Sequence, residues 1–362
     1  MPYIVSTGVS LPKYKLSQEE AKELIRHLFP RKQSELERLL PVFDHANIEE
    51  RQFIVPVDWF KERHSLSERN HLYIKEAISH SIEAIKDCIS NNTFLNNDVV
   101  PNEIDCLVFV SSTGIATPTL DAYCINELGF REDVIRMPLF GLGCLGGAAG
   151  VSRVHDWLTA NPKKSALLVN VEFCSLAFQK EDKRISNFVG TALFGDGVSC
   201  ALLIGDESEL KQKGKGALPY IHATSSKTKL DSLDVMGWDI RDSGFHVIFA
   251  KSIPKLVDTF WKEHVIGFLV QNKLTVDDFS FFTAHPGGQK VLDAMQTVLT
   301  CEKEKFAFSY EILRNHGNMS SPTVMYCLRK AMLSKPVSGT NTLLTALGPG
   351  FSSEIVWLEW KQ

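Results

Sequence analysis

The chain has 362 residues, of which 44% are hydrophobic and 23% are charged. This composition is typical of a folded globular protein and excludes a disordered or fibrous one. The formal net charge of −4 provides no bulk positive field for nucleic acid or an anionic membrane. No apolar run reaches the roughly 18 residues that span a bilayer, and the first residues lack a signal-peptide pattern. We therefore expect a cytoplasmic protein, without membrane insertion, that is long enough for two core-forming units.

Eight cysteines occur at positions 88, 106, 124, 144, 174, 200, 301 and 327. None belongs to a CxxC pair, and several lie inside apolar runs, which is typical of reduced thiols in a cytosolic protein. No histidine spacing matches a metal site. We therefore expect neither disulfides nor a bound metal.

The predicted elements alternate between strands and helices. The first strand ends before Pro12, and a helix begins after Ser17, where SQEE is a capping box. Short apolar runs bounded by Gly, Ser or Pro predict buried strands at 106–112, 165–173, 198–205, 279–285, 341–347 and 354–360. Helical periodicity predicts helices at 71–89, 118–128, 253–271, 289–299 and 323–332. This alternation predicts an α/β protein.

Two segments late in the chain repeat a pattern found earlier. Residues 103–114 and 277–287 both run from an acidic residue through an apolar strand to a small polar turn. Residues 193–204 and 347–358 both place a Gly-x-Gly turn before a strand. Because both echoes occur in the same order, they indicate that one half of the chain repeats the plan of the other.

The repeat predicts two similar halves with a division near residue 210. The first, 1–210, would carry the candidate nucleophile, and the second, 211–362, would carry the other polar candidates. The polar stretch 207–235 is the predicted seam between them.

The most distinctive segment is the glycine-rich stretch 138–150, which contains Cys144. Its Gly141-x-Gly143-x-x-Gly146 spacing fits the dinucleotide fingerprint only formally, because a cysteine lies in the loop and no ribose-binding acid lies about 20 residues further on. A cysteine where a glycine turn enters a helix meets unpaired N–H groups and the positive end of the helix dipole, which favours a thiolate. The alternative is a buried structural cysteine. A catalytic role for Cys144 therefore requires a base near it.

The candidate base is His285, at the end of an apolar strand, where ligands bind in α/β sheets. The proline that follows fixes the chain, and Gly287 and Gly288 leave room for a bulky ligand. The third candidate is Asn318, which could also simply cap the next helix. Together Cys144, His285 and Asn318 could supply a nucleophile, an imidazole and an amide donor at a central cleft.

At this point the sequence resembles the thiolase superfamily, and within it the bacterial type III polyketide synthases related to plant chalcone synthase, most of all the Bacillus-type alkylpyrone synthases. The motifs that carry the resemblance occur in the family's order over nearly the whole chain: GCLGG at 143–147, LFGDG at 193–197, HPGG at 285–288, GNMSS at 317–321 and GPGFSSE at 348–354. The resemblance implies a thiolase-like αβαβα layered sandwich of two similar halves, a homodimer, and CoA thioesters as substrates without a cofactor.

The resemblance also assigns the catalytic roles. Cys144 would be the acylated nucleophile, and a Cys144–His285 ion pair is expected to keep its thiolate populated at neutral pH. His285 and Asn318 would stabilise the enolate that forms when malonyl-CoA loses carbon dioxide.

Further positions carried over by motif concern substrate binding. Phe194 matches a gatekeeper between the CoA tunnel and the cavity, with a core aromatic as the alternative, and Ser320 is expected in the cavity lining. Gly287 and Gly288 are expected to contact CoA. Arg51 falls near a CoA-contacting arginine of the family, and a solvated surface arginine is the alternative.

Four positions depart from the plant enzymes. Val247 stands in place of a second gatekeeper phenylalanine, Cys174 and Ala177 replace cavity threonines, and Thr117 replaces a methionine that reaches across the dimer. These residues are smaller or less polar. Because each buried CH₂ contributes about 0.8 kcal/mol, we expect the freed volume to accept a long aliphatic acyl chain.

The expected reaction is the decarboxylative Claisen condensation of a long-chain fatty acyl-CoA with malonyl-CoA. Two extensions would give a triketide alkylpyrone, and a third would give an alkylresorcinol. A ketoacyl synthase III or a hydroxymethylglutaryl-CoA synthase is the alternative within the fold, although the GNMSS and GPGF motifs argue against both. A non-catalytic acyl-lipid-binding relative is the alternative from another class, and the intact Cys, His and Asn speak against it.

Overall fold

The computed structural model of the protein describes residues 1–29 and 31–362. In this part of the chain, nine strands form one mixed sheet in the order β11-β12-β13-β8-β1-β7-β6-β4-β5. They are β1 (Tyr3–Ser10), β4 (Cys106–Ser111), β5 (Ile135–Phe140), β6 (Ser165–Phe173), β7 (Asp196–Ile204), β8 (Leu218–Thr228), β11 (Phe281–Ala284), β12 (Asn341–Gly348) and β13 (Ser352–Lys361). Two small sheets pair β2 (Tyr14–Ser17) with β3 (Glu50–Phe53), and β9 (Met236–Arg241) with β10 (Gly244–Phe249).

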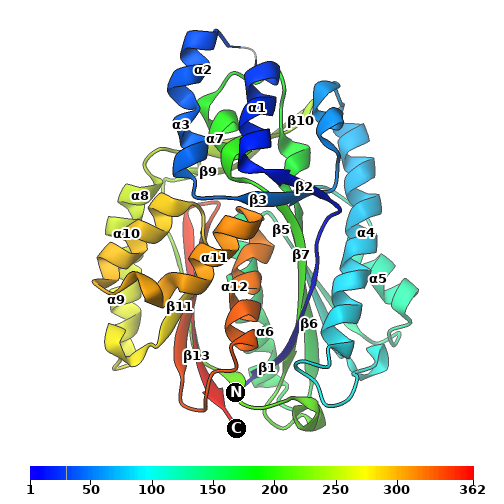
Figure 1. Cartoon of the computed structure of the whole chain (residues 1–362). Coiled ribbons are helices and arrows are strands. Elements are labelled where there is room, and N and C mark those ends of the chain that lie inside the picture. Colours follow the sequence, from blue (N-terminus) through cyan, green and yellow to red (C-terminus); the bar gives the residue numbers. More distant parts are fainter. Residues whose placement is uncertain (30) are drawn as a thin grey trace.

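Apart from those above one end of the sheet, the helices form three layers, one between the two halves of the large sheet and one on each outer side. Their bounds are α1 (Gln18–Leu28), α2 (Gln33–Leu39), α3 (Pro41–His45), α4 (Leu66–Ser90), α5 (Leu120–Leu128), α6 (Gly146–Ala160), α7 (Ile185–Leu193), α8 (Ile253–Leu256), α9 (Lys262–Gln271), α10 (Gln289–Leu299), α11 (Ala307–His316) and α12 (Ser321–Leu333). Helices α6 and α12 lie between the two halves of the sheet, with α4 and α5 outside one half and α8 to α10 outside the other (Figure 1). This arrangement confirms the predicted αβαβα sandwich.

The strand pairing repeats between the two halves. In the first half, β4 pairs parallel with β6, β6 antiparallel with β7, and β7 antiparallel with β1. The same succession of one parallel and two antiparallel pairings links β11, β12, β13 and β8. The halves meet where β1 and β8 pair through Tyr3 and Tyr220. This repeated topology is the structural form of the echo in the sequence.

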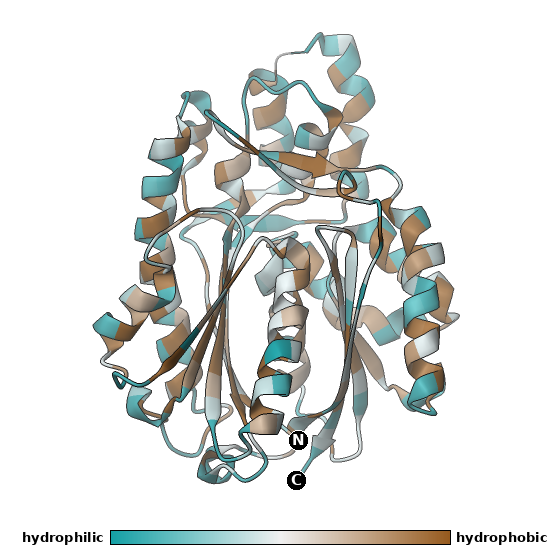
Figure 2. Ribbon diagram, turned by 180° about the vertical axis from the view of Figure 1, so that it is seen from behind, coloured by the Kyte–Doolittle hydropathy of each residue, from teal (hydrophilic) through white to brown (hydrophobic). Residues whose placement is uncertain are grey.

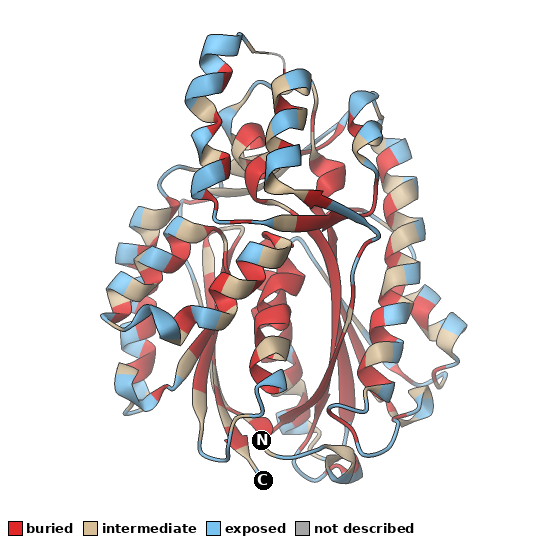
Figure 3. Cartoon of the chain, viewed as in Figure 1, coloured by how far each residue is buried: buried red, intermediate tan, exposed pale blue. Residues whose placement is uncertain are grey.

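The centre of the sandwich is the most deeply buried part of the fold. Every residue of β6 and β7 is buried, because helices cover both faces of these strands. The central helices are buried on nearly all sides, as the red colour of α12 in Figure 3 shows. Hydrophilic residues gather instead on the outer faces of the flanking helices (Figure 2). The N-terminal ends of α6 and α12 therefore lie inside the molecule.

A cap stands above the end of the sandwich that is remote from the two termini. It contains α1, α2, α3 and α7 together with the small sheets β2–β3 and β9–β10 (Figure 1). Helix α1 begins after Ser17, which forms the predicted capping box with Glu20. The cap closes over the side of the molecule where the candidate residues lie.

Three of the differences between the structure and the predicted elements bear on the core sheet and its cover. The predicted seam, 207–235, is only partly a connection, because β8 within it is a central strand whose polar Ser225 is bonded to buried His264 at 2.9 Å. The single helix predicted at 253–271 is divided by a π-helical turn at Val257–Trp261. Strand β5 has no counterpart among the predicted strands, because it contains Pro138, which a sheet tolerates at its edge.

Two further observations concern the described residues, 1–29 and 31–362. They include no helix with the length and apolar character needed to cross a membrane. They also include no group of three His, Cys, Asp or Glu side chains that could hold a metal ion, and their eight cysteines are all free, with every one except Cys301 buried.

Candidate active site

Cys144 lies in a 3₁₀ turn, Gly143–Leu145, that leads directly into α6. Gly143 has a φ of +49°, and a Cβ there would lie 2.9 Å from the Pro349 ring, so only glycine fits. The Gly143 N–H donates to Ser112 Oγ at 2.9 Å, which ties the turn to the end of β4. The turn therefore holds the thiol at the N-terminus of α6.

Helices α6 and α12 touch through glycine at their N-terminal ends. A Cβ at Gly147 would lie 2.4 Å from the carbonyl oxygen of Ser321, and a Cβ at Gly146 would lie 3.0 Å from Ser321 Cβ. No larger side chain fits between the two helices at this level. The residues that precede them, Cys144 and Asn318, are thereby brought together from the two halves of the chain.

Asn318 is fully buried, and its neighbours fix the orientation of its amide. The Ser320 N–H donates to Oδ1 at 2.8 Å, and the Cys144 thiol donates to the same oxygen at 3.8 Å. The amide nitrogen, Nδ2, therefore points the other way and donates to the Gly287 carbonyl at 3.3 Å. The second N–H of Nδ2 has no partner among the described residues.

His285 follows β11, and its backbone N–H donates to the Thr345 carbonyl of β12 at 2.8 Å. The side chain is 3% exposed, and neither ring nitrogen has a hydrogen-bond partner within the described chain. Buried polar atoms without partners are rare, so such a ring is available to a ligand. Cys144, His285 and Asn318 line one small cavity, which we call the catalytic cavity.

Burial determines the charge states of the two titratable groups. It raises the pKa of Cys144 to about 11, although hydrogen bonds with Ser320 and Asn318 act in the opposite direction. It lowers the pKa of His285 to about 3. Both groups are therefore neutral at pH 7. The direction of both pKa shifts opposes the expected resting ion pair, because burial removes the solvation of each charge.

Glu172 is a buried acid beside this site to which the sequence assigned no role. It accepts hydrogen bonds from Ser112 N (3.0 Å), Thr113 Oγ1 (2.9 Å) and Ser321 Oγ (3.0 Å). Burial raises the pKa of Glu172 to about 7. Its carboxylate links the ends of β4 and β6 to the start of α12. An acidic residue inside the apolar run 165–173 was the signal for it.

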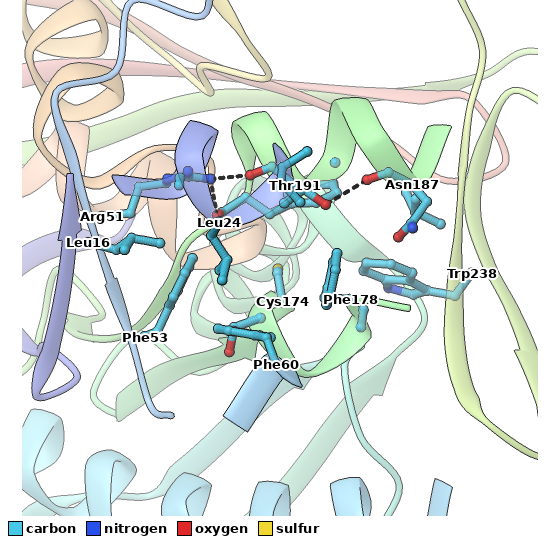
Figure 4. A pocket seen from close by; sticks show the side chains of 17 residues that line it. Leu16, Leu24, Arg51, Phe53, Phe60, Cys174, Phe178, Asn187, Thr191 and Trp238 are labelled. Atoms are coloured by element: carbon cyan, nitrogen blue, oxygen red, sulfur yellow. Dashed lines mark hydrogen bonds between the residues drawn. The ribbon is translucent and has the colours of Figure 1, made fainter. Parts of the chain in front are cut away.

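The structure brings together four of the residues expected to contact substrate. Phe194, Val247, Cys174 and Ala177 line one inner cavity of about 40 Å³. Its walls are mainly apolar, and Figure 4 shows aromatic side chains gathered around Cys174.

The far wall of the inner cavity comes from parts of the chain that sequence reasoning missed. Leu24 of α1, Phe53 of β3 and Phe60, which follows β3 in a short 3₁₀ turn, all line it (Figure 4). These residues lie more than 100 positions before the motifs that predicted the cavity. Only the tertiary fold, which places the cap over the sandwich, brings them to it.

A narrow neck lies between the inner cavity and Cys144. Phe194 and Val247 line both spaces, and Cys144 and Ser320 line the neck. The Phe194 ring lies 5.9 Å from the Trp238 ring on the hairpin β9–β10, centroid to centroid. Phe194 therefore lines the passage between the thiol and the inner cavity.

An outer cavity of about 610 Å³ adjoins the catalytic cavity, and Gly287 and Gly288 line it. The two spaces share Gly287, Phe249 of β10, Ile253 of α8 and Val291 of α10. Arg38, Lys251 and Lys290 line the outer cavity, and all three are exposed. None of the three forms an ion pair within 4.0 Å in residues 1–29 and 31–362.

Arg51 does not match the expected contact with CoA or the solvated alternative. It is fully buried, and its Nη1 donates to the carbonyls of Thr191 (2.6 Å) and Phe194 (3.0 Å), as Figure 4 shows in part. Its guanidinium is therefore bonded within the chain, to these two carbonyls and to Gln18 Oε1. Thr117 is exposed before α5, next to a cis peptide bond with Pro118, and lines none of the cavities described above.

Two family models match most of the chain. The family model for the N-terminal domain of chalcone and stilbene synthases matches residues 5–208, and that for the C-terminal domain matches residues 222–359. A Bacillus subtilis (strain 168) protein named "Putative chalcone synthase" is 41% identical over all of this chain and all of its own length. The 1,3,6,8-tetrahydroxynaphthalene synthase of Streptomyces peucetius subsp. caesius is 33% identical, covering 99% of this chain and 93% of that protein.

Solved structures agree with the sequence relatives. The 1,3,6,8-tetrahydroxynaphthalene synthase of Streptomyces coelicolor A3(2), a bacterial type III polyketide synthase, superimposes with a TM-score of 0.91 and 27% identity over 99% of both chains. The fold and site thus define an acyl-transferring condensing enzyme. The chain belongs to the chalcone and stilbene synthase family, whose bacterial members are type III polyketide synthases. The family acts on CoA thioesters, including malonyl-CoA, and uses no separate cofactor.

Proposed function

We propose that the protein condenses a long-chain fatty acyl-CoA starter with malonyl-CoA and releases triketide alkylpyrones. The observation that carries this proposal is the apolar inner cavity beyond Phe194. Its near wall has small side chains at Val247, Cys174 and Ala177. An acyl chain on Cys144 can reach this space through the neck, and each CH₂ that it buries contributes about 0.8 kcal/mol.

The inner cavity is about 40 Å³, so it takes a long chain only when the side chains that fill it move. The far wall is the part best suited to move. Leu24 belongs to a helix of the cap, whereas Cys174 and Ala177 of the near wall lie in the turn that follows β6 of the sandwich. We therefore expect the length of the accepted chain to depend on Leu24 and its neighbours in α1.

The first proposed step is acylation of Cys144. The starter enters through the outer cavity, where Arg38, Lys251 and Lys290 can meet the phosphates of CoA. The Cys144 thiol gives its proton to a ring nitrogen of His285, and the sulfur attacks the thioester carbonyl. The CoA sulfur leaves as the new thioester forms and takes the proton from His285. The ion pair thus exists only during transfer, which agrees with the neutral resting groups.

The second proposed step is decarboxylation of malonyl-CoA. Loss of carbon dioxide leaves the electron pair on the thioester enolate, whose oxygen needs donors aimed at it. His285 N–H and the free N–H of Asn318 Nδ2 face the same cavity and supply two. The enolate carbon then attacks the acyl group on Cys144, and the cysteine sulfur leaves. The Cys144 thiolate then takes the diketide from its CoA thioester, CoA leaves, and a second round gives a triketide on CoA. An enol oxygen of this chain attacks the thioester carbonyl, and CoA leaves as the pyrone ring closes.

The test is a product survey with acyl-CoA starters from short to long, each with malonyl-CoA, analysed by mass spectrometry. We expect triketide pyrones and a preference for long chains. Alkylresorcinols would show a third extension and replace the pyrone assignment. A product from malonyl-CoA alone, or an absolute need for acyl carrier protein, would contradict the proposed starter. Absence of product with every starter would instead support a non-catalytic acyl-lipid-binding relative, and product formation by Cys144→Ala would show that Cys144 is not the nucleophile.

We also propose that the protein is a cytoplasmic homodimer built around β5. This strand ends the sheet, and its second edge is unpaired in the described part of the chain. Ile135 and Phe140 on β5 are 45% and 57% exposed, and an apolar open edge invites pairing with a second copy. Thr117 is the proposed contact across this interface. Light scattering should show a dimer that Phe140→Asp converts to monomer; a monomeric parent protein would contradict this.

A further inference from the structure

Arg51 is a buried charge that forms no ion pair within 4.0 Å in residues 1–29 and 31–362. Its three hydrogen bonds go to the carbonyls of Thr191 and Phe194 and, from Nη2 at 2.9 Å, to Gln18 Oε1. Burial lowers the pKa of Arg51 to about 10, so it stays charged at neutral pH. A buried charge is costly unless hydrogen bonds compensate it, so its retention calls for a specific role.

The backbone that Arg51 holds is joined to Asn318. Phe194 and Asn318 form an isolated parallel β-bridge. The Asn318 N–H donates to the Leu193 carbonyl at 2.8 Å, and the Gly195 N–H donates to the Asn318 carbonyl at 3.0 Å. The carbonyl that accepts from Arg51 thus lies between two residues that are bonded to Asn318.

A second contact links Arg51 to the same segment. A Cβ at Gly317 would lie 2.8 Å from Arg51 Cδ and 2.9 Å from its Cγ, so the aliphatic part of Arg51 packs directly on the residue before Asn318. Gly317 has a φ of +65°, which sets the direction in which the chain enters Asn318. Arg51 therefore supports Asn318 from the bridge and from Gly317.

The end of α7 explains why a cation occupies this place. The last carbonyls of a helix lack partners within the helix, and they form the negative end of its dipole. Arg51 bonds the carbonyls of Thr191 and Phe194, and Gln18 Nε2 bonds that of Ala192 at 3.1 Å. Arg51 thus closes a helix end at the position where that end meets the catalytic segment.

We propose that Arg51 is a positioning residue for the decarboxylation step, holding the Phe194 backbone and, through the β-bridge, the Asn318 amide in place. The inference rests on the proposed role of Asn318. A donor to an enolate works only if it is aimed at the position of the developing charge, so a small displacement of the bridge lowers the rate of decarboxylation.

Arg69 offers a matched control elsewhere in the fold. It is also buried and forms no ion pair within 4.0 Å among the described residues. Its Nη1 donates to the carbonyls of Leu176 (2.5 Å) and Phe178 (3.0 Å), and its Nε donates to that of His64 (3.1 Å). None of these bonds involves the bridge to Asn318. A substitution of Arg69 therefore disturbs the same kind of interaction without touching the catalytic segment.

The experiment compares Arg51→Lys with Arg69→Lys in the full-length protein. A lysine keeps the charge but cannot reproduce the forked set of bonds. For each variant, carbon dioxide release from labelled malonyl-CoA, acylation of Cys144 by intact mass, and thermal unfolding are measured. We expect similar losses of thermal stability in the two variants. Decarboxylation should fall at least about tenfold in Arg51→Lys and stay within about twofold in Arg69→Lys, while Cys144 is still acylated in both.

Equal decarboxylation by Arg51→Lys and the parent protein, or an equal loss in Arg69→Lys, would overturn the proposal. If Arg51→Lys does not fold, Gln18→Met serves instead, because it removes one acceptor of Arg51 and the bond to Ala192 while keeping the guanidinium. Its decarboxylation should fall about threefold or more, and an unchanged rate would overturn the proposal. Asn318→Ala is measured in parallel. If Asn318→Ala still decarboxylates malonyl-CoA at the parent rate, the proposed role of Asn318 is wrong. If Asn318→Ala loses decarboxylation but Arg51→Lys retains it, only the inference about Arg51 is wrong.

Discussion

Phe194 and Asn318 are joined by their backbones in an isolated parallel β-bridge. One carries the aromatic ring at the neck of the inner cavity, and the other carries the amide of the catalytic cavity. The backbone hydrogen bonds therefore couple the position of Phe194, at the proposed entrance for the acyl chain, to that of Asn318, the proposed donor to the enolate. A change that shifts either residue along the bridge is expected to shift the other.

The first prediction concerns the donor. Asn318→Ala removes the amide that faces the catalytic cavity and should lower malonyl-CoA decarboxylation about a hundred- to a thousandfold, because one such donor contributes about 2.7–4 kcal/mol to the barrier. Release of labelled carbon dioxide measures this loss. Acylation of Cys144, followed by intact mass, should continue in the variant. A loss of decarboxylation smaller than about tenfold would show that His285 suffices.

The second prediction concerns the pH dependence of Cys144. Burial raises the pKa of its thiol to about 11. As long as the pH is below this pKa, each increase of one pH unit should make the reactive thiolate about ten times more abundant. The rate of alkylation by iodoacetamide, read by mass spectrometry at Cys144, should keep rising up to pH 9. A rate that levels off near pH 6 would instead reveal a resting ion pair with His285.

The third prediction tests whether Glu172 contributes to the raised pKa of Cys144. The nearby Glu172 carboxylate disfavours the thiolate and contributes to the raised pKa of Cys144. Glu172→Gln removes this charge with little change in shape, so the alkylation profile should move to lower pH. Thermal unfolding of the variant shows whether the buried hydrogen bonds survive the change. A profile that moves to higher pH would contradict the electrostatic effect.

The fourth prediction uses opposite changes to the two walls of the inner cavity. Val247→Phe fills the near wall and should reduce turnover of long starters more than that of short ones. Leu24→Ala enlarges the far wall and should favour the longest starters. Turnover of each acyl-CoA, relative to the shortest, measures the preference. Equal losses across all chain lengths in Val247→Phe would mean that the acyl chain does not occupy this cavity.

The candidate catalytic residues could be found from the sequence because each is marked by its neighbours in the chain. A glycine turn before a helix marks Cys144, and the HPGG and GNMSS motifs mark His285 and Asn318. The strand at 165–173 and the helix at 289–299 were predicted with the bounds that the structure has, because apolar runs and turn residues delimit them. The positions of these motifs and the bounds of these elements depend on residues that are close together in the sequence.

The remaining features depend on neighbours in space. The sequence around Arg51, EERQF, is polar and predicts an exposed side chain. Arg51 is buried because the end of α7 packs against it, and nothing near Arg51 in the sequence indicates this contact. The charge states of Cys144 and His285 follow from complete burial, which a local helix N-terminus does not reveal. Strand β8 is polar where its serines bond buried side chains, so its composition resembled that of a connection.

Part of the wall of the inner cavity comes from a different part of the fold than Cys144 and Asn318. Cys144 and Asn318 stand at the touching ends of α6 and α12, where glycine contacts leave no freedom. Val247 and Leu24 belong to β10 and α1, which lie in the cap. Substitutions in the cap can therefore accumulate without disturbing the crossing of the two central helices. A gene encoding such a protein can drift toward new products in single steps while every intermediate keeps a working reaction centre.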